Sequence, residues 1–428
     1  MGSALKDDIA ALAPPAREHW RRNLRLHVSS HVLSQLGDAL MNPRTSLAWL
    51  AGSLGASPAV LALLVPVRES GSLLPQPLLA RWLHARAQRR GLWACGAVLQ
   101  ALAVLGLASL AWAWRSNGLE HAGQWPGLAL LGLLALFALA RALCSVTGKD
   151  VLGRSVPRGQ RGRASGWAAA ISGFLVLLLA GLAWAGLESG AESRWLPFWL
   201  LAAALCWLLA APLFVGIREP AAEPSGAGRG LGLSLLLRDD LLRRFVLARG
   251  LLLGSALSPP FFVALAQQQT DGPGLLAFVA AGGVAGLVGG LVWGRLADRS
   301  SRRTLGLAAV LASLCTLGLA VAAALDLPLL GSAWLLPAGF LLVSLAHEGV
   351  RVGRKTWIVN IAEGARRIDY VAVSNAAMGA LLLAVGVLTA LLATVSTPGV
   401  LLLLAVIGLV GAWLGLRLPE AEAQVGDR

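Results

Sequence analysis

Long apolar runs recur along the whole chain, and short polar segments separate them. There are twelve runs, at about residues 27–50, 57–80, 91–114, 126–147, 164–187, 195–216, 245–266, 274–293, 304–324, 330–350, 370–393 and 397–416. Each has roughly the 20 residues that an α-helix needs to cross a hydrocarbon core of about 30 Å. The runs lack the apolar and polar alternation of a membrane barrel strand. Since backbone groups in lipid must be hydrogen-bonded within the protein, the pattern predicts twelve transmembrane helices.

A longer polar segment divides these runs into two sets of six. It contains the stretch EPAAEPSGAGRG, whose Pro, Gly and Ser content is typical of a linker. We therefore expect a cytoplasmic tail (1–26), an N-terminal six-helix bundle (27–216), a cytoplasmic linker (217–244), a C-terminal six-helix bundle (245–416) and a second tail (417–428).

Composition agrees with a membrane protein. The 428 residues are 57% hydrophobic and 14% charged, and the mean hydropathy is +0.70, whereas soluble domains are about 25% charged. The net charge of +14 could suggest a nucleic-acid partner, but 30 of the 36 Lys and Arg residues lie in the termini and in alternate loops. The other loops hold only Arg115 and Arg194. This bias follows the positive-inside rule, so it predicts cytoplasmic termini, contact with membrane lipids and no nucleic acid.

Several kinds of site and signal are not expected. Asp7, Asp8 and two prolines precede the first apolar run, which argues against a cleavable signal peptide. The four cysteines fall within predicted spans and lack metal-site spacing, so we expect no metal and no cofactor. The chain contains no Gly-x-x-x-x-Gly-Lys-Ser/Thr loop for ATP phosphates.

The two halves of the chain repeat one another in three places. LGDALMNP (36–43) matches LGSALSPP (253–260), RWLHARAQRR (81–90) matches GRLADRSSRR (294–303), and the stretch from Ala140 corresponds to the stretch from Ala346. Internal repeats that meet at a binding site are a common plan of transporters.

GRLADRSSRR resembles the G-x-L-A-D-R-x-G-R-R signature of the major facilitator superfamily, found between the second and third helix of each half. The resemblance extends in topology over nearly the whole chain. It implies an all-α membrane fold with two pseudo-symmetric six-helix bundles, and a transporter instead of an enzyme. We expect a monomer in a bacterial cytoplasmic (inner) membrane.

The resemblance also implies a conformational gate, with the glycine allowing close helix approach and the aspartate capping and pairing with basic residues. These roles fall on Gly294, Asp298, Arg299, Arg302 and Arg303. Ser301 stands where the family often has glycine. In the other copy, Arg81 and Ala85 occupy the glycine and aspartate positions, so the 81–90 segment is either a gate or a basic loop only.

Polar residues inside the first two spans suggest a site, because such residues are costly in lipid. Residues from His27 to Asn42 recur at steps of three and four, so they form one helical face that lines water or a partner helix. Asp38 on this face is either a coupling site, an anchor for a cationic substrate group, or a structural carboxylate. Arg68 in the second span can pair with Asp38 or with its neighbour Glu69.

Spans 4 and 10 add Arg141 and the pair His347–Glu348. The repeat aligns Arg141 with His347. Imidazole titrates near neutral pH, so His347 and Glu348 form either a proton-handling pair or a simple hydrogen-bonded pair. The candidate substrate and proton pathway therefore comprises Asp38, Asn42, Arg68, Glu69, Arg141, His347 and Glu348. Ser258 and two following prolines should break span 7.

These features predict a secondary active transporter that moves a small organic solute by alternating access, with proton coupling. The alternatives are a drug or metabolite efflux antiporter and a non-transporting receptor or assembly factor. Span 5 lacks the proline of the antiporter signature, which weighs against the first, and the altered 81–90 copy favours the second. No nucleophile and base stand at a convincing spacing, so we expect no catalytic residues. Charges concentrate in the N-terminal half, which suits an amphipathic solute better than a sugar.

Overall fold

The structure is a computed structural model, and it describes residues 8–10, 12–84, 86–117, 124–186, 192–221, 234–268, 274–361 and 364–420. Within these residues all regular structure is helical. Ten helical segments among them are long and apolar enough to cross a membrane. The predicted spans 1 and 2 are not among the ten, and both carry charged residues and breaks.

The first half of the chain forms α2 (Pro14–Leu40), α3 (Ser46–Ser53), α4 (Pro58–Leu73), α5 (Gln76–His84), α6 (Arg90–Asn117), α7 (Trp125–Ser155), α8 (Arg158–Gly186) and α9 (Glu192–Val215). The second half forms α10 (Ser234–Arg238), α11 (Asp240–Leu251), α12 (Gly254–Leu257), α13 (Pro259–Gln267), α14 (Leu275–Arg299), α15 (Ser301–Ala324), the 3₁₀ helix η2 (Pro328–Gly331), α16 (Leu335–Ile361), α17 (Gly364–Ala393) and α18 (Thr397–Leu416).

Several helices continue well beyond the spans predicted from their apolar runs. The first span was predicted to begin at residue 27, but α2 begins at Pro14. Likewise α7 continues to Ser155 and α16 to Ile361. Hydropathy reports the part of a helix that matches the hydrocarbon core, whereas polar turns beyond that core remain helical. On the side that carries the basic loops, the helices therefore extend past the spans predicted from hydropathy.

Spans 1 and 7 are interrupted at corresponding positions of the repeat. In span 1, α2 ends at Leu40 and α3 begins at Ser46, and the side chain of Asn42 accepts a hydrogen bond of 2.9 Å from the backbone N–H of Arg44. In span 7, α11 ends at Leu251, the short helix α12 covers Gly254–Leu257, and α13 begins after Ser258. Proline lacks the N–H of a regular helical turn, so Pro43 accounts for the break of span 1, and Pro259 and Pro260 account for the interruption of span 7 at Ser258. The predicted break at Ser258 is confirmed.

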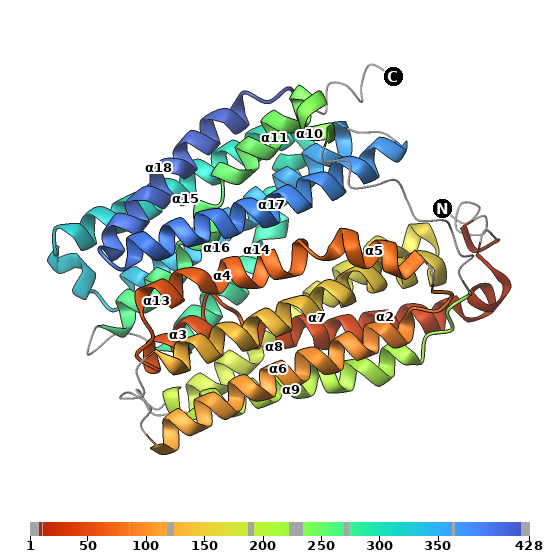
Figure 1. Cartoon of the computed structure of the whole chain (residues 1–428), viewed down its shortest axis with the longest axis horizontal. Helices are drawn as coiled ribbons and strands as arrows, with labels where there is room; N and C mark the ends of the chain where they lie inside the picture. The colour runs from red at the N-terminus through yellow and green to blue at the C-terminus, as the bar shows by residue number, and fades with distance from the viewer. Residues whose placement is uncertain are drawn as a thin grey trace.

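Helices from the same half of the chain pack closely on one another. In the first half, α2 contacts α8 and α9, α6 contacts α7 and α9, and α4 contacts α7. In the second half, α15 contacts α16 and α18, α14 contacts α16, and α11 contacts α18. The two sets lie side by side, and they meet where α4 contacts α17, α8 contacts α14 and α3 contacts α13 (Figure 1).

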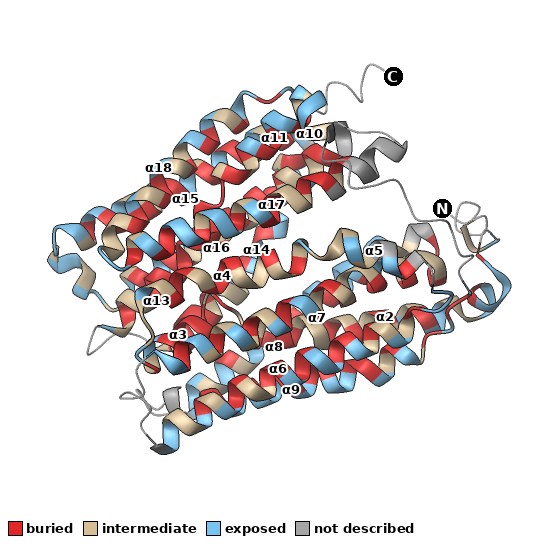
Figure 2. Cartoon of the chain, viewed as in Figure 1, coloured by how far each residue is buried: buried red, intermediate tan, exposed pale blue. Residues whose placement is uncertain are grey.

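Buried and exposed positions form stripes along the long helices (Figure 2). Many exposed positions are large and apolar, including Trp125, Phe174, Leu291 and Leu391, whose exposed fractions are 75%, 61%, 75% and 66%. A soluble monomer rarely exposes so much apolar surface. Lipid is therefore the natural solvent of these stripes.

Gly254, the first residue of α12 in span 7, occupies a position where a side chain does not fit. A Cβ atom there would lie 2.3 Å from the backbone carbonyl oxygen of Leu404 on α18, and a backbone atom can move only if the helix moves. We expect Gly254→Ala to lower the free energy of unfolding by about 2 kcal/mol through overpacking. Thermal melting of the purified protein in detergent measures this loss.

Gly290→Ala is the matched control. A Cβ atom at Gly290 on α14 would meet no atom within 4 Å, and alanine is the better helix former by up to about 1 kcal/mol. This variant should melt at or above the wild-type temperature. Equal losses in the two variants would contradict the packing described for Gly254.

Candidate functional site

Asp38 lies at the meeting point of three helices of the first half. Its carboxylate accepts a hydrogen bond of 3.1 Å from Arg68 on α4 and forms an ion pair with Arg141 on α7. Arg68 also pairs with Glu69 at 2.7 Å. The side chains of Asp38 and Arg68 are only 16% and 12% exposed. Both pairs that the sequence left as alternatives for Arg68 are therefore formed, and Arg141 joins them.

This arrangement bears on the role considered for Asp38. Two guanidinium groups already surround its carboxylate, so the negative charge is neutralised within the protein. A cationic substrate group would have to compete with both arginines. The geometry favours a carboxylate that holds the arginines in place over one that awaits a cation.

Arg44 connects the two halves of the chain. It lies in the break between α2 and α3, and its Nη2 is 3.1 Å from Nε2 of His347 on α16. The other ring nitrogen of His347 is 3.1 Å from the hydroxyl of Ser255 on α12. A guanidinium group only donates, so Nε2 accepts and Nδ1 carries the proton that is donated to Ser255. His347 is therefore neutral in this arrangement.

The predicted pairing of His347 with Glu348 is wrong. Glu348 forms an ion pair with Arg351 on the next turn of α16, while His347 bonds to Arg44 and Ser255. Adjacent residues of a helix point about 100° apart. The two side chains therefore contact different partners.

These residues belong to one network, which we call the interhalf charge cluster. Its members are Asp38, Arg44, Arg68, Glu69, Arg141, Arg249, His347, Glu348, Arg351 and Arg354. Glu69 stands near its centre, because Arg44 and Arg354 both interact electrostatically with it from opposite halves of the chain. The side chains of Glu69 and Arg351 are 35% and 58% exposed. Charged groups avoid lipid, so these exposed parts indicate that water reaches the cluster.

A second group of charges, not predicted from the sequence, surrounds Glu219. This residue follows the end of α9 by four positions, and its side chain is 0% exposed. It accepts hydrogen bonds of 2.9 Å from the backbone N–H groups of both Arg89 and Arg90, at the N-terminus of α6. Arg154 on α7 pairs with Glu219 and also with Asp150. The carboxylate thus combines ion pairing with the favourable end of a helix dipole.

Glu420 occupies the equivalent place in the second half. It follows the end of α18 by four positions and accepts hydrogen bonds of 2.9 Å from the hydroxyl of Ser300 and 2.7 Å from Arg302. Both donors lie at the N-terminus of α15, the counterpart of α6. Since Arg302 aligns with Arg89 in the repeat, the shared spacing beyond the last helix of each half is the sequence signal that could have revealed both glutamates.

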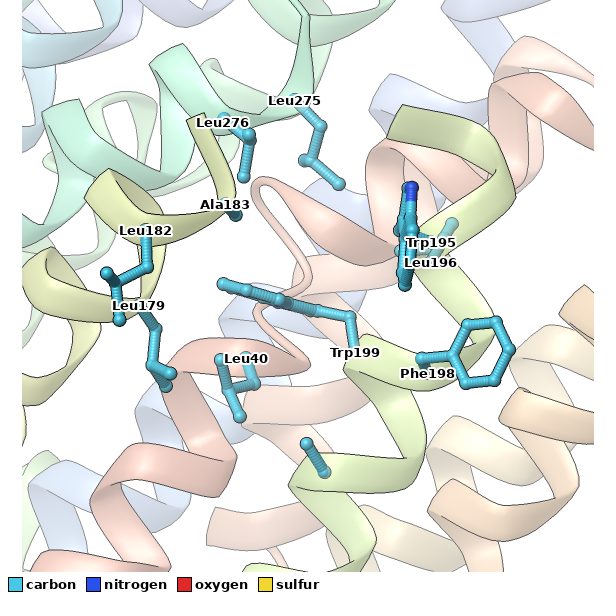
Figure 3. A pocket seen from close by; sticks show the side chains of 11 residues that line it. Leu40, Leu179, Leu182, Ala183, Trp195, Leu196, Phe198, Trp199, Leu275 and Leu276 are labelled. Atoms are coloured by element: carbon cyan, nitrogen blue, oxygen red, sulfur yellow. The ribbon is translucent and has the colours of Figure 1, made fainter. Parts of the chain in front are cut away.

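An apolar cavity of about 400 Å³ lies apart from these charges, between α8, α9 and α14. Its lining side chains are exclusively aliphatic or aromatic, and Trp199 extends across its centre toward Leu179 and Leu182 (Figure 3). Leu40, at the end of α2, closes one side. Such a cavity can accommodate an apolar moiety or a lipid chain, but it offers no charged group to a polar ligand.

Comparison with known proteins decides the family. The sequence matches the Major Facilitator Superfamily over residues 28–343. The chain belongs to the major facilitator superfamily. No match is found among curated proteins.

Solved structures of major facilitator transporters share the fold. The crystal structure of a D-xylose-proton symporter superposes with a TM-score of 0.69 at 15% identity, covering 94% of this chain and 98% of that one. The inward-open xylose transporter XylE from E. coli gives 0.66 at 14% identity, with coverages of 93% and 96%. The nucleoside transporter NupG gives 0.67 at 12% identity, with coverages of 92% and 99%. At these identities the likeness establishes the fold of a membrane transporter and nothing about the solute.

The structure agrees with only some of the roles predicted for the residues of the superfamily signature. A Cβ atom at Gly294 would meet no atom within 4 Å, so the expected close helix approach at this glycine is wrong. Arg302 and Arg303 both pair with Glu420 of their own half. Arg299 is exposed. The backbone of Asp298 lies in α14, but its side chain is outside the described residues, so its gating role stays a prediction.

The polar face of α2 packs mainly against partner helices. His27 is buried, and its ring bonds to the hydroxyl of Ser155 on α7 at 3.0 Å. Gln35 accepts a hydrogen bond of 3.2 Å from Ser172 on α8. Of the two environments expected for this face, the partner helix therefore applies to these residues. Asn42 is occupied in capping the break before α3.

Proposed function

We propose that this superfamily member is a secondary active transporter that moves a small organic solute by alternating access, with proton coupling. The observation that carries the proposal is the contact between Arg44 and His347, since it joins the two halves at the break of span 1. A scaffold has no need of such charges within its membrane helices, where they are costly. Transport, the function known for the family, would use these charges.

The proposal includes the organisation predicted from the sequence. It comprises twelve spans in two pseudo-symmetric six-helix bundles, a cytoplasmic linker and cytoplasmic termini. The repeated breaks of spans 1 and 7 support the symmetry, and the distribution of Lys and Arg supports the orientation.

Proton coupling would act through His347. In its neutral form the ring accepts from Arg44 through Nε2. A proton on Nε2 would remove the acceptor and place a second positive charge against the guanidinium group. The charges of Arg351 and Arg354 on the same helix add to this repulsion. Protonation would therefore break the contact between the halves, which links proton binding to a change in their arrangement.

Reconstitution into proteoliposomes tests the function. Solutes that stabilise the purified protein in a thermal-shift screen are first identified, since a ligand of the folded state raises its apparent stability. We expect a radiolabelled stabilising solute to accumulate under an imposed pH gradient, and a protonophore to abolish the accumulation. Entry at the rate of empty liposomes for every such solute would favour the non-transporting receptor instead.

His347→Gln is expected to separate coupling from exchange. Glutamine keeps a hydrogen-bonding side chain at this position but cannot take up a proton near neutral pH. Gradient-driven accumulation should fall to the equilibrium level, while exchange of labelled against unlabelled solute should continue. Accumulation at the wild-type level would show that His347 does not couple transport to protons.

A further inference from the structure

Positive charge exceeds negative charge in the interhalf charge cluster. The cluster holds six arginines, and its carboxylates are Asp38, Glu69 and Glu348. The ion pairs among its described residues join Asp38 to Arg68 and Arg141, Glu69 to Arg68, and Glu348 to Arg351. No carboxylate in the described part of the chain forms an ion pair with Arg44, Arg249 or Arg354. With His347 neutral, the described members of the cluster therefore carry three more positive charges than negative ones.

The three unpaired arginines come from both halves of the chain. Arg44 lies in the break of span 1 and contacts His347. Arg354 stands seven residues beyond His347, so the two share one face of α16. Arg249 on α11 donates to the side chains of Ser374 and Asn375 on α17, which are neutral. Arg44 and Arg354 both interact with Glu69 and Glu348, which places them around one region.

The positive-inside rule does not explain Arg44 and Arg249, which lie within predicted spans, whereas Arg354 is one of the basic residues that follow predicted span 10. Charges that orient a membrane protein lie in loops, where they contact water and lipid headgroups. All three are instead partly buried, Arg44 in the break of span 1, Arg249 in α11 and Arg354 in α16. Removing such charges from water is expensive unless a counter-charge is supplied. No described carboxylate forms an ion pair with any of the three, and Glu69 and Glu348 act on Arg44 and Arg354 only beyond ion-pair distance.

We propose that the transported solute is an organic anion whose carboxylate or phosphate group binds between Arg44 and Arg354. This inference rests on the proposed transport function and specifies its substrate class. Guanidinium groups bind both kinds of oxyanion through two parallel hydrogen bonds. Because the two arginines come from opposite halves, the bound anion would connect them, and its arrival and departure would change the interaction between the halves.

Binding is measured on the full chain in detergent with compounds matched in shape and different in charge. Benzoate is compared with benzamide for the carboxylate, and glucose 6-phosphate with glucose for the phosphate. Chloride and inorganic phosphate at equal ionic strength test for small inorganic ions. We expect at least one organic anion to raise the melting temperature more than its neutral counterpart does. Equal shifts within both pairs would overturn the inference, as would stabilisation by the inorganic ions only.

Variants locate the site. Arg44→Gln and Arg354→Gln should each raise the Kd of the stabilising anion at least about tenfold, the change that a loss of about 1.4 kcal/mol of binding free energy produces. Arg354→Lys keeps the charge and should raise the Kd less. Arg238→Gln on α10 removes an exposed arginine outside the cluster and should leave the Kd unchanged. A Kd that is unchanged in both cluster variants would overturn the assignment.

The ligand-free variants separate binding from a structural role. Removing an uncompensated, partly buried cation should leave the melting temperature of the ligand-free protein unchanged or raise it. A marked fall in both variants, with the Kd unaltered, would show that these arginines serve only the fold. Anion binding without uptake would refute transport and leave the anion site standing. Uptake of a neutral solute without any effect of anions would support transport and refute the anion site.

Discussion

Asp38→Asn is expected to lower the free energy of unfolding by about 3 kcal/mol, because breaking a buried ion pair leaves its partner charge uncompensated. Arg68 would retain Glu69, but Arg141 would lose the carboxylate that it pairs with. Thermal melting of the purified protein in detergent measures the loss. A melting temperature equal to that of the wild type would contradict the network described around Asp38.

A second variant identifies the origin of the loss. Asp38→Asn combined with Arg141→Gln removes both charges, so it should recover most of the melting temperature. Asp240→Asn is the control, because Asp240 is 50% exposed and pairs with Arg243 and Arg244 at the surface, where such pairs contribute at most about 1 kcal/mol. If Asp38 has a role beyond stability, the double variant should fold and still fail to accumulate solute. Accumulation at the wild-type level would refute that role.

Glu219→Gln is expected to cost about 4 kcal/mol of unfolding free energy, the larger of the two effects. The side chain is 0% exposed and accepts from two backbone N–H groups and Arg154. Glutamine would keep one acceptor oxygen, but its amide NH2 group would face the N–H groups of the backbone and of Arg154, which also donate. Several polar groups would then be buried without partners. Melting in detergent again measures the change.

Glu420→Gln provides the comparison within the same molecule. Glu420 holds the equivalent place in the second half, but its side chain is 29% exposed. Water can replace lost hydrogen bonds there, so the expected cost is about 1 kcal/mol. The difference between the two variants isolates burial, since the substitution and the repeat position are the same. Similar losses would mean that burial does not decide the contribution.

The sequence predicted the family and ten of the twelve expected spans because lipid imposes a simple rule. An apolar run of sufficient length has few alternatives to a transmembrane helix, and the prolines after Ser258 marked the interruption of span 7. The break of span 1 at Pro43 was not predicted. The polar ends of α2 and α7 could not be predicted from hydropathy, since they lie outside the region where that rule applies. A signature match likewise could not reveal that the space beside Gly294 is open, because this depends on the neighbouring helices.

The sequence predicted part of the residues in the interhalf charge cluster and few of their pairings. Arg68 was expected to pair with either Asp38 or Glu69, and it pairs with both. The contact between Arg44 and His347 joins residues 303 positions apart, and nothing local to either residue indicates it. Sequence proximity suggested Glu348 as the partner of His347 instead. His347 and Glu348 have different partners because adjacent side chains of a helix point in different directions.

The hydrogen bonds and the ion pair of Glu219 have a consequence for biosynthesis. Arg89, Arg90 and Arg154 all precede Glu219 in the chain. A nascent chain that has emerged as far as Pro220 therefore already contains every group that fastens the end of α9 to α6 and α7. The first half can therefore form the contacts of Glu219 with Arg89, Arg90 and Arg154 before the second half has been synthesised.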